Sequence, residues 1–509
     1  MNNTNRIIFN TIVLYAKIVI VMIINLWTVP LLLRALGQSD YGIYQLVAGV
    51  IAMLSFLNAA MTVSSQRFLS VTMGEKNEKK LNVVYNASIV LHIVIGLAIV
   101  VLLEICAPFL FSGFLNIPEG RTIAAKWVYQ FLIISTFFTI AAVPFDAVLN
   151  AHENMIVFAI INIMEISLKL VLALLLPYLP GDSLIFYGGG WALISIIGVC
   201  TRYIYTRLKY RSLVPDYKQF DISVFKEMFG FAGWNTFSAF AMVGRNQGIA
   251  IILNWFLGTI VNAAYGIANQ INGLLVYFSA TLQKSINPQL MKSEGMHDEK
   301  RLILFAYSLS KASFLALSIL AIPLIIEMPY VLSLWLGDDI PANTIEFSRY
   351  ILVMSMIYQF SAGLMSSIQS RGIIRNYTLT ICGILLLNLP IAYMILRLGY
   401  PSYYVMIGMI AVELLCLIVR LCFAHHLCKV DIRDYCIKII LPSIIVVSIV
   451  FTCLWIISIL FESSFIRLCI ICILDVALFA PLSYYFILSK IERERITQLL
   501  HPFLNRIKK

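Results

Sequence analysis

Nine charged side chains lie inside long hydrophobic stretches of this 509-residue sequence. A charged side chain at the centre of a membrane helix costs about 2.5–3.5 kcal/mol on insertion scales. Such residues therefore usually face a bundle interior or a water-filled cavity, where they can bind ions or charged ligands. The nine are Lys17, Glu104, Glu165, Lys169, Arg245, Lys311, Glu327, Glu413 and Asp475.

Arg245 is the strongest candidate for binding an anion. It lies near the middle of a hydrophobic stretch, within A-M-V-G-R-N-Q-G, and Asn246 and Gln247 follow it. Lys17 lies in the inner half of the first stretch, which also holds Asn25. We predict that Arg245 and Lys17 bind the anion, with Asn246, Gln247 and Asn25 as further polar groups of one cavity. The alternatives are that Lys17 extends to the cytoplasmic interface and that Arg245 pairs with a buried acid.

Three acids inside the stretches could titrate or bind a coupling ion: Glu165, Glu413 and Asp475. Glu165 lies four residues before Lys169, and this spacing favours an ion pair along one helix face. Asp475 has no such neighbour. The acids are therefore candidates for ion coupling, with Glu165 also open to a purely structural interpretation.

No pattern for catalysis, a metal or a cofactor is present. The sequence has no G-x-x-x-x-G-K-S/T loop for nucleotide phosphates and no H-E-x-x-H. The C-x-x-C at Cys469 and Cys472 lies in a hydrophobic stretch with no histidine near it. Adjacent histidines at 425 and 426 point about 100° apart on a helix and cannot readily chelate one metal. We expect neither an enzyme nor a nucleotide-driven pump.

The composition is that of a membrane protein. Hydrophobic residues make up 61% of the chain and charged residues 12%, and the mean hydropathy is +0.89. About 20 apolar residues span a bilayer, and backbone groups in lipid must bond within their own segment. We therefore predict an all-α integral membrane protein with about fourteen spans. They lie near 11–33, 44–65, 84–111, 124–148, 155–176, 185–205, 231–256, 261–282, 302–336, 344–368, 377–396, 403–423, 436–460 and 465–488.

The charge distribution predicts the topology. With the N-terminus inside, 27 Lys and Arg residues lie in cytoplasmic segments and 6 on the opposite side, as the positive-inside rule requires. The net charge of +11 thus sits at span ends and does not indicate nucleic acid. No cleavable signal peptide is evident, so the first helix is expected to remain as an anchor. Both termini are predicted to be cytoplasmic.

Three landmarks recur at nearly constant spacing and indicate an internal repeat. The tyrosines of two Y-G-I motifs, Tyr41 and Tyr265, are 224 positions apart, the ends of the fourth and tenth spans are 219 apart, and Arg202 and Arg420 are 218 apart. An even number of helices per repeat places both halves in the membrane in the same direction. The predicted regions are an N-terminal lobe at 1–210, a cytoplasmic amphipathic linker at 211–230, a pseudo-symmetric C-terminal lobe at 231–428, two extra spans at 429–489 and a basic amphipathic tail at 490–509.

Several segments together resemble the polysaccharide flippases of the exporter superfamily that also contains multidrug antiporters. They are V-P-L-L-L-R-A-L-G-Q-S-D-Y-G-I-Y, S-S-Q-R-F, N-P-Q-L-M-K-S-E-G, A-I-P-L-I-I-E-M-P-Y-V-L-S-L-W-L-G and I-Q-S-R-G-I-I-R-N-Y. The resemblance implies a two-lobed bundle in the bacterial cytoplasmic membrane. It also implies alternating access that moves an undecaprenyl-pyrophosphate-linked oligosaccharide through a cationic cavity between the lobes.

On this resemblance, Arg245 and Lys17 would hold the pyrophosphate, by location rather than by a shared motif. Membrane lipid, a polysaccharide polymerase and chain-length proteins would be the partners. A cation-coupled small-molecule exporter of the same superfamily remains the main alternative, and it would use Glu165, Glu413 or Asp475. A membrane glycosyltransferase or polymerase would need a sizeable outside loop or globular region, and neither is evident.

Overall fold

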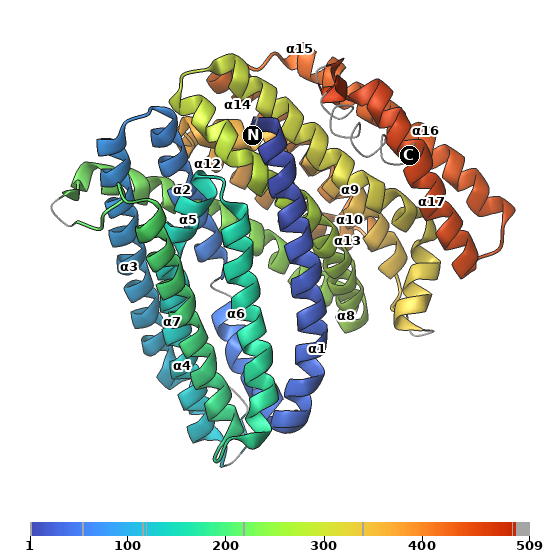
Figure 1. Ribbon diagram of the computed structural model, residues 1–509. Helices are drawn as coiled ribbons and strands as arrows, with labels where there is room; N and C mark the ends of the chain where they lie inside the picture. The colour runs from blue at the N-terminus through green and yellow to red at the C-terminus, as the bar shows by residue number, and fades with distance from the viewer. Residues whose placement is uncertain are drawn as a thin grey trace, which may run out of the picture. The chain divides into compact units, whose positions relative to one another are not determined.

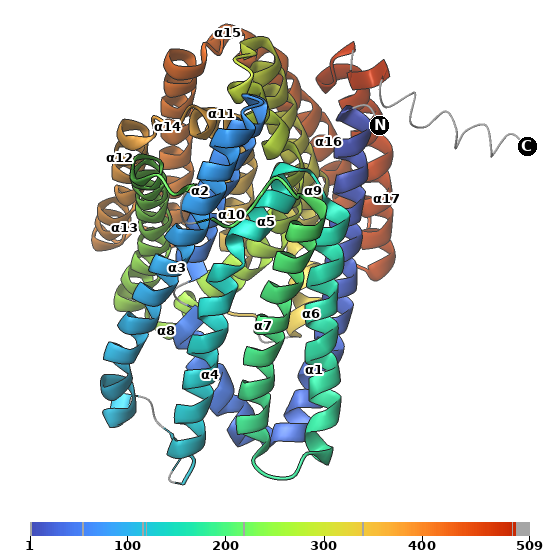
Figure 2. The ribbon, with the colours of Figure 1, turned by 60° about the vertical axis from the view of Figure 1, so that its left-hand side comes forward.

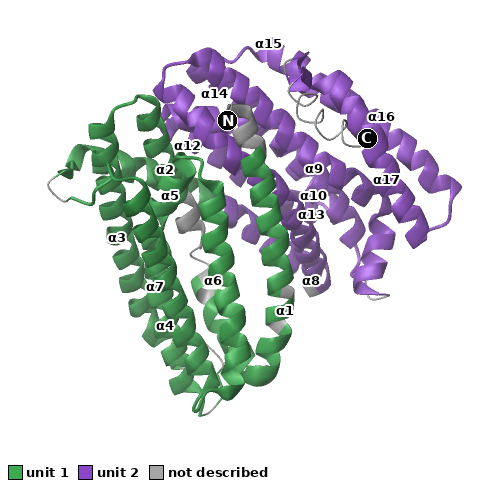
Figure 3. Cartoon of the chain, in the orientation of Figure 1, with its two compact units in different colours: residues 1–239 green, residues 240–509 purple. Residues whose placement is uncertain are grey.

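The computed structural model describes residues 3–52, 55–114, 117–118, 120–216, 219–337, 340–490 and 492–494. All regular secondary structure in these ranges is helical, as predicted. The chain forms two compact units, residues 1–239 and 240–509 (Figure 3). Most of the tail predicted at 490–509 lies outside the described residues.

Unit 1 is a bundle in which α1 packs along α6 and α4 packs along α7 (Figures 1 and 2). Its main core joins α1, α3, α4 and α7 through apolar side chains such as Val47, Leu103, Val128 and Tyr187. Its helices are α1 (Asn3–Ala52), α2 (Ser55–Gly74), α3 (Glu78–Phe109), η1 (Leu110–Phe114), α4 (Thr122–Ala141), α5 (Val143–Ala151), α6 (Met155–Leu175), η2 (Leu176–Tyr178) and α7 (Ser183–Lys209).

Unit 2 contains most of α8 and the remaining helices. Side chains of α8, α10, α13 and α14 form its described core cluster, and α16 and α17 pack on α9. The helices are α8 (Ile222–Gly295), α9 (Glu299–Leu336), α10 (Thr344–Gln359), α11 (Ala362–Arg371), α12 (Arg375–Leu386), α13 (Asn388–Arg397), α14 (Tyr403–Cys428), α15 (Ile432–Tyr435), η4 (Cys436–Ile440), α16 (Leu441–Leu460), α17 (Phe465–Leu482) and η5 (Ser483–Ile487).

Two glycines break the longest helices at matching points of the sequence repeat. Gly37 in α1 has φ 75° and ψ 166°, and Gly258 in α8 has φ 77° and ψ −171°. Side chains other than glycine rarely adopt a positive φ, so a glycine lets the chain turn between consecutive helical segments. Both glycines belong to the L-G pairs that precede the repeated Y-G-I motifs.

The helices confirm the predicted all-α membrane fold. In the described part of the chain, ten helices are long and apolar enough to cross a membrane, or eleven if α10 and α11, bent by 45°, form one span. The three other predicted spans, 44–65, 231–256 and 261–282, are helical in their described residues. They contain Gly, Asn and Gln, which lower their mean hydropathy. Some predicted spans are therefore less apolar than an ordinary lipid-facing helix.

A cluster of charges joins three connections of unit 1. The Arg121 guanidinium donates to Asp182 Oδ2 at 2.6 Å and also pairs with Asp40. Asp182 caps α7, because its Oδ1 accepts from the backbone N–H groups of Leu184 and Ile185. The hydrogen bond from Arg121 holds the pKa of the Asp182 carboxyl below its usual range. The cluster thus fastens the starts of α4 and α7 to the bend of α1.

Candidate substrate-binding site

Arg245 is buried in α8 and forms no ion pair with the acids that the structure describes. The residue is 7% exposed, and its Nε and Nη2 donate to Asn246 Oδ1 at 3.1 and 3.0 Å. None of the ion pairs in the described ranges includes Arg245. The expected alternative, a pair with a buried acid, is therefore not formed among the described residues. A buried cation needs compensation, and Asn246 Oδ1 supplies part of it.

Three neutral groups lie within electrostatic reach of Arg245: Tyr265 after the break in α8, Tyr358 in α10 and Cys416 in α14. Tyr358 and Cys416 are also within reach of the ion pair between Arg420 and Glu413. Tyrosine and cysteine side chains are uncharged at pH 7 in their ordinary state. These groups can accept or donate hydrogen bonds, but they do not cancel the positive charge.

The other polar residues predicted for the site have different positions. Asn246 is partly buried, and its Oδ1 accepts a hydrogen bond from Arg245 Nε. Gln247 is exposed, and two helical steps of about 100° each place it on the opposite side of α8 from Arg245. Asn25 is exposed on α1 in unit 1. Within unit 2, the structure therefore brings Asn246, but not Gln247, to the Arg245 guanidinium.

Lys17 lies inside unit 1 and contacts an aromatic ring. Its Nζ is 4.9 Å from the ring centroid of Phe158 in α6, a cation–π arrangement. Asp146, Glu165 and Arg202 contribute to its electrostatic surroundings. The side chain is partly buried. Lys17 is thus part of a charged region inside unit 1.

Arg202 binds the two carboxylates of this charged region. Its Nε donates to Asp146 Oδ1 at 2.8 Å, and Nη1 and Nη2 donate to Glu165 Oε1 and Oε2 at 2.6 and 3.2 Å. The residue is 5% exposed. Bidentate pairs of this kind are among the strongest hydrogen-bonded contacts in proteins. Both carboxylate oxygens of Glu165 therefore already accept hydrogen bonds from Arg202. Glu165 is a weaker candidate for ion coupling than the sequence indicates.

The ion pair expected between Glu165 and Lys169 is not formed. Lys169 Nζ instead lies 3.5 Å from the ring centroid of Trp191 in α7. Arg202 presents a planar fork that matches a carboxylate, whereas lysine offers a point charge, so the contact across helices replaces the local one. Lys17 and Lys169 are both left with an aromatic ring as the contacting group. Together with Arg202 and its two acids, they give this region an excess positive charge.

A glycine lets Glu165 reach Arg202. A Cβ added at Gly198 of α7 would lie 1.8 Å from Glu165 Oε1 and 2.9 Å from Arg202 Nη1. The carboxylate therefore occupies the space that a side chain at this position would fill.

We expect Gly198→Ala to destabilise unit 1 by about 3 kcal/mol, because it separates the buried Arg202 guanidinium from the partly buried Glu165 carboxylate. The loss would appear as a lower thermal midpoint of the purified protein. Gly189→Ala on the same helix is the control, because its Cβ would find its nearest neighbour at 3.6 Å, an ordinary contact. Equal midpoints for both variants would contradict the proposed close approach.

The corresponding arginine of the second repeat makes a similar contact in unit 2. Arg420 and Glu413 of α14 are 1% and 3% exposed, and Nη1 lies 2.5 Å from Oε1. Arg420 Nη1 also donates to Ser361 Oγ at 3.1 Å, at the break between α10 and α11. Glu413 is thus neutralised, like Glu165. Of the three acids predicted for ion coupling, Asp475 alone has no ion-pair partner among the described residues.

Arg202 and Arg420 are buried and Asp146 is partly buried; the sequence marks the two arginines as landmarks of the repeat but does not predict the ion pairs of these three residues. Arg202 and Arg420 end hydrophobic stretches and were predicted to be cytoplasmic charges that fix topology. The signal that could have revealed them is their spacing of 218, because two arginines at equivalent repeat positions indicate a shared internal role. Asp146 lies in a short helix, four residues before Asn150. No spacing pattern in the sequence distinguishes it as a partner of Arg202.

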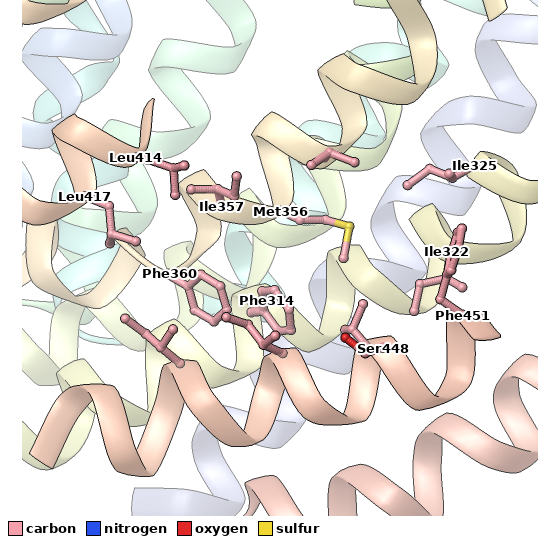
Figure 4. Close-up of a pocket in the computed structure, with 14 residues that line it drawn as sticks. Phe314, Ile322, Ile325, Met356, Ile357, Phe360, Leu414, Leu417, Ser448 and Phe451 are labelled. Carbon is pink, nitrogen blue, oxygen red and sulfur yellow. The ribbon is translucent and has the colours of Figure 1, made fainter. Parts of the chain in front are cut away.

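An apolar pocket of about 400 Å³ lies in unit 2 among α9, α10, α14 and α16 (Figure 4). Phe314, Met356, Phe360 and Phe451 line it, and Ser448 is the single polar side chain in the lining. Charged groups would lose their hydration there without a partner. The pocket can therefore accept hydrocarbon but not a phosphate or a sugar.

The sequence of this chain matches a family model described as polysaccharide biosynthesis protein over residues 7–293. This match covers more than half of the chain, which therefore belongs to that family. A search of curated proteins found no match.

Solved structures with a similar fold include two that their titles call transporters. The chain matches a MATE crystal structure in the bent conformation with a TM-score of 0.74 and 14% identity, covering 84% of this chain and 96% of that one. An outward-facing multidrug resistance MATE family transporter of the MOP superfamily matches with a TM-score of 0.69 and 15% identity, covering 84% of this chain and 96% of that one. A MOP superfamily transporter from Pyrococcus furiosus, with a binding pocket of reverse polarity, matches with a TM-score of 0.70 and 15% identity, covering 85% of this chain and 98% of that one. The chain is a multi-pass membrane protein with this fold.

Proposed function

We propose that the chain moves an undecaprenyl-pyrophosphate-linked oligosaccharide from the inner to the outer leaflet of the bacterial cytoplasmic membrane. The buried Arg245, which has no acidic partner among the described residues, is the observation that carries the proposal. Membership of the polysaccharide biosynthesis family supports the substrate class.

A pyrophosphate needs such a cation to cross. Bare charge in hydrocarbon faces a cost of tens of kcal/mol in the Born limit. A guanidinium presents paired N–H groups that match phosphate oxygens, and a partly dehydrated site strengthens each contact. We assign Arg245 to the pyrophosphate in unit 2. Lys17 and Lys169 of unit 1 each hold positive charge against an aromatic ring, and we assign them to a separate anion-binding region within unit 1.

The membrane potential would favour the outward direction. An inside-negative potential assists outward movement of an anion by about 2.3 kcal/mol per charge per 100 mV. The protein then needs to lower the barrier for the headgroup, and the lipid chain can stay in hydrocarbon. The apolar pocket of unit 2 is suited to hydrocarbon alone.

A cation-coupled multidrug antiporter is the second candidate, because structures with this fold include a multidrug resistance transporter. Excess positive charge near Lys17, Lys169 and Arg245 would repel cationic drugs. The observed charge therefore favours an anionic substrate over the cationic compounds that such an exporter would carry.

Reconstitution separates the two candidates. The purified chain would be placed in liposomes that contain labelled undecaprenyl-pyrophosphate oligosaccharide, and the sugar exposed outside would be measured with a membrane-impermeant reagent. We expect faster exposure than in liposomes without protein and no uptake of a cationic dye under a sodium or proton gradient. Dye transport without movement of the lipid would overturn the proposal.

A further inference from the structure

Asp475 lies in the buried stripe of α17. Ile471, Asp475 and Phe479 follow one another at four-residue spacing and face the interior. Asp475 is 0% exposed. The helix packs against α16, which runs beside it in Figure 1, and against α9. The carboxyl group is therefore enclosed among three membrane helices of unit 2.

Neither oxygen of the Asp475 carboxyl has a hydrogen-bond partner in the described part of the chain. The basic residue of α17, Arg467, lies eight residues earlier, about 12 Å along the axis at 1.5 Å per residue. Its guanidinium is already engaged, because Nη2 donates to Glu327 Oε2 and Nη1 to Phe461 O, both at 2.7 Å. Asp475 thus has no counter-charge within the described ranges.

The packed elements supply no further partner. On α9, Glu327 pairs with Arg467 and Lys311 pairs with Glu492. No charged residue occurs in α16. The remaining ionisable groups of these elements are Cys469 and Cys472 of α17, Cys453 of α16, Tyr484 and Tyr485 of η5, and Glu299, Lys300, Arg301, Tyr307 and Tyr330 of α9.

A carboxylate in this position would be unstable. A buried charge without a partner or a hydrogen bond is far more costly than its neutral form, and lipid offers no water. The carboxyl group therefore holds a proton while α17 is packed. We propose that Asp475 is a proton-binding site, and that release of its proton is linked to separation of α17 from α9.

The contact between α9 and α17 has the features of a movable interface. Helix α9 is interrupted at Glu327, with φ −89° and ψ 15°, between Pro323 and Pro329. Two ion pairs hold it to α17 and the residues that follow: Glu327 with Arg467, and Lys311 Nζ with Glu492 Oε2 at 3.2 Å. Asp475 lies between Arg467 and Glu492 in sequence. Water must reach the carboxyl group before it can accept the proton, so the interface has to open first.

This arrangement would couple a proton gradient to movement of the C-terminal helices. With the proton bound, the neutral side chain stabilises the packed state. With the proton transferred to water, the carboxylate stabilises the hydrated, open state. A gradient that favours one form on one side of the membrane would bias the two states. The inference goes beyond the proposed function and does not depend on the identity of the substrate.

Carbodiimide labelling tests the site directly. The reagent dicyclohexylcarbodiimide enters membranes and modifies protonated carboxyl groups, and peptide mass spectrometry of the full chain locates the adduct. We expect an adduct on Asp475 that decreases several-fold from mildly acidic to alkaline pH. Asp434→Asn is the matched control, because the Asp434 side chain is 48% exposed and pairs with Lys438, and this variant should label at Asp475 like the original chain.

Infrared spectroscopy gives a second measurement. The C=O stretch of a protonated carboxylic acid should weaken in Asp475→Asn, which keeps the side-chain size, and should be unchanged in Asp434→Asn. Absence of both the adduct and the band change would overturn the proposal. Protection of Asp475 from the reagent by sodium at constant pH would also overturn it, in favour of a sodium site. The carbodiimide adduct and the infrared band do not depend on lipid transport. A negative lipid transport assay would therefore count against the proposed function and not against the proton-binding site.

Discussion

Replacement of Arg245 by glutamine is expected to reduce surface polysaccharide by about 10- to 100-fold in cells that depend on this chain. A charge-assisted hydrogen bond contributes about 1.5–3 kcal/mol, and each 1.4 kcal/mol is tenfold in rate. Glutamine keeps a hydrogen-bonding side chain in α8 but removes the positive charge. The effect should therefore appear in transport, with little change in protein abundance. Quantifying extracted polysaccharide at matched abundance measures it.

Two variants of α8 separate binding from folding. Arg245→Lys keeps the charge but loses the planar fork, so we expect partial activity. Gln247→Ala alters an exposed side chain on the opposite side of α8, and we expect activity close to that of the unchanged chain. Normal polysaccharide in Arg245→Gln cells would show that the guanidinium does not hold the substrate.

Much of the fold follows from the sequence because membrane helices obey simple physical rules. Length and hydropathy predicted the helical segments, and the repeated L-G and Y-G-I motifs marked the two breaks at Gly37 and Gly258. The number of strongly apolar helices was harder to predict. Segment 231–256 contains Arg245 and other polar residues, so its position in the chain rather than its hydropathy identifies it as a span.

The partners of the buried charges could not be predicted in the same way. Sequence spacing reveals neighbours along one helix, and it suggested Lys169 as the partner of Glu165. The structure brings Arg202 to Glu165 from α7, at a point where Gly198 leaves room. Partner choice across helices depends on side-chain reach and helix packing, which no local pattern records. Arg245 could be identified from the sequence because a charged residue in the middle of a hydrophobic stretch is costly, whatever its neighbours are.

The neutralised acids also change the interpretation of ion coupling. Glu165 and Glu413 each accept hydrogen bonds from an arginine, and a bound cation would have to compete with that guanidinium. Asp475 has no such competitor. Coupling through Asp475 would place the ion-responsive group on the helices that follow the repeat, apart from Arg245 in α8. The substrate charge and the coupling proton would then be handled by different parts of unit 2.

Breaking the pair between Arg420 and Glu413 is expected to destabilise the protein by about 3–5 kcal/mol, because either single change leaves one uncompensated buried charge. Arg420→Met leaves the Glu413 carboxylate without its partner at 2.5 Å. Glu413→Gln leaves the guanidinium with neutral partners such as Ser361 Oγ and no carboxylate. Thermal midpoints of the two purified variants should both fall well below that of the unchanged chain.

The double variant Arg420→Met with Glu413→Gln should recover most of this loss, because replacing both members of a buried pair removes the uncompensated charge. A double-mutant cycle isolates the interaction. If the pair only stabilises the bundle, the double variant should also retain transport. Loss of transport in a double variant of normal stability would show instead that Glu413 takes part in coupling. The comparison thus decides whether the carboxylate that Arg420 neutralises is a structural group or an ion site.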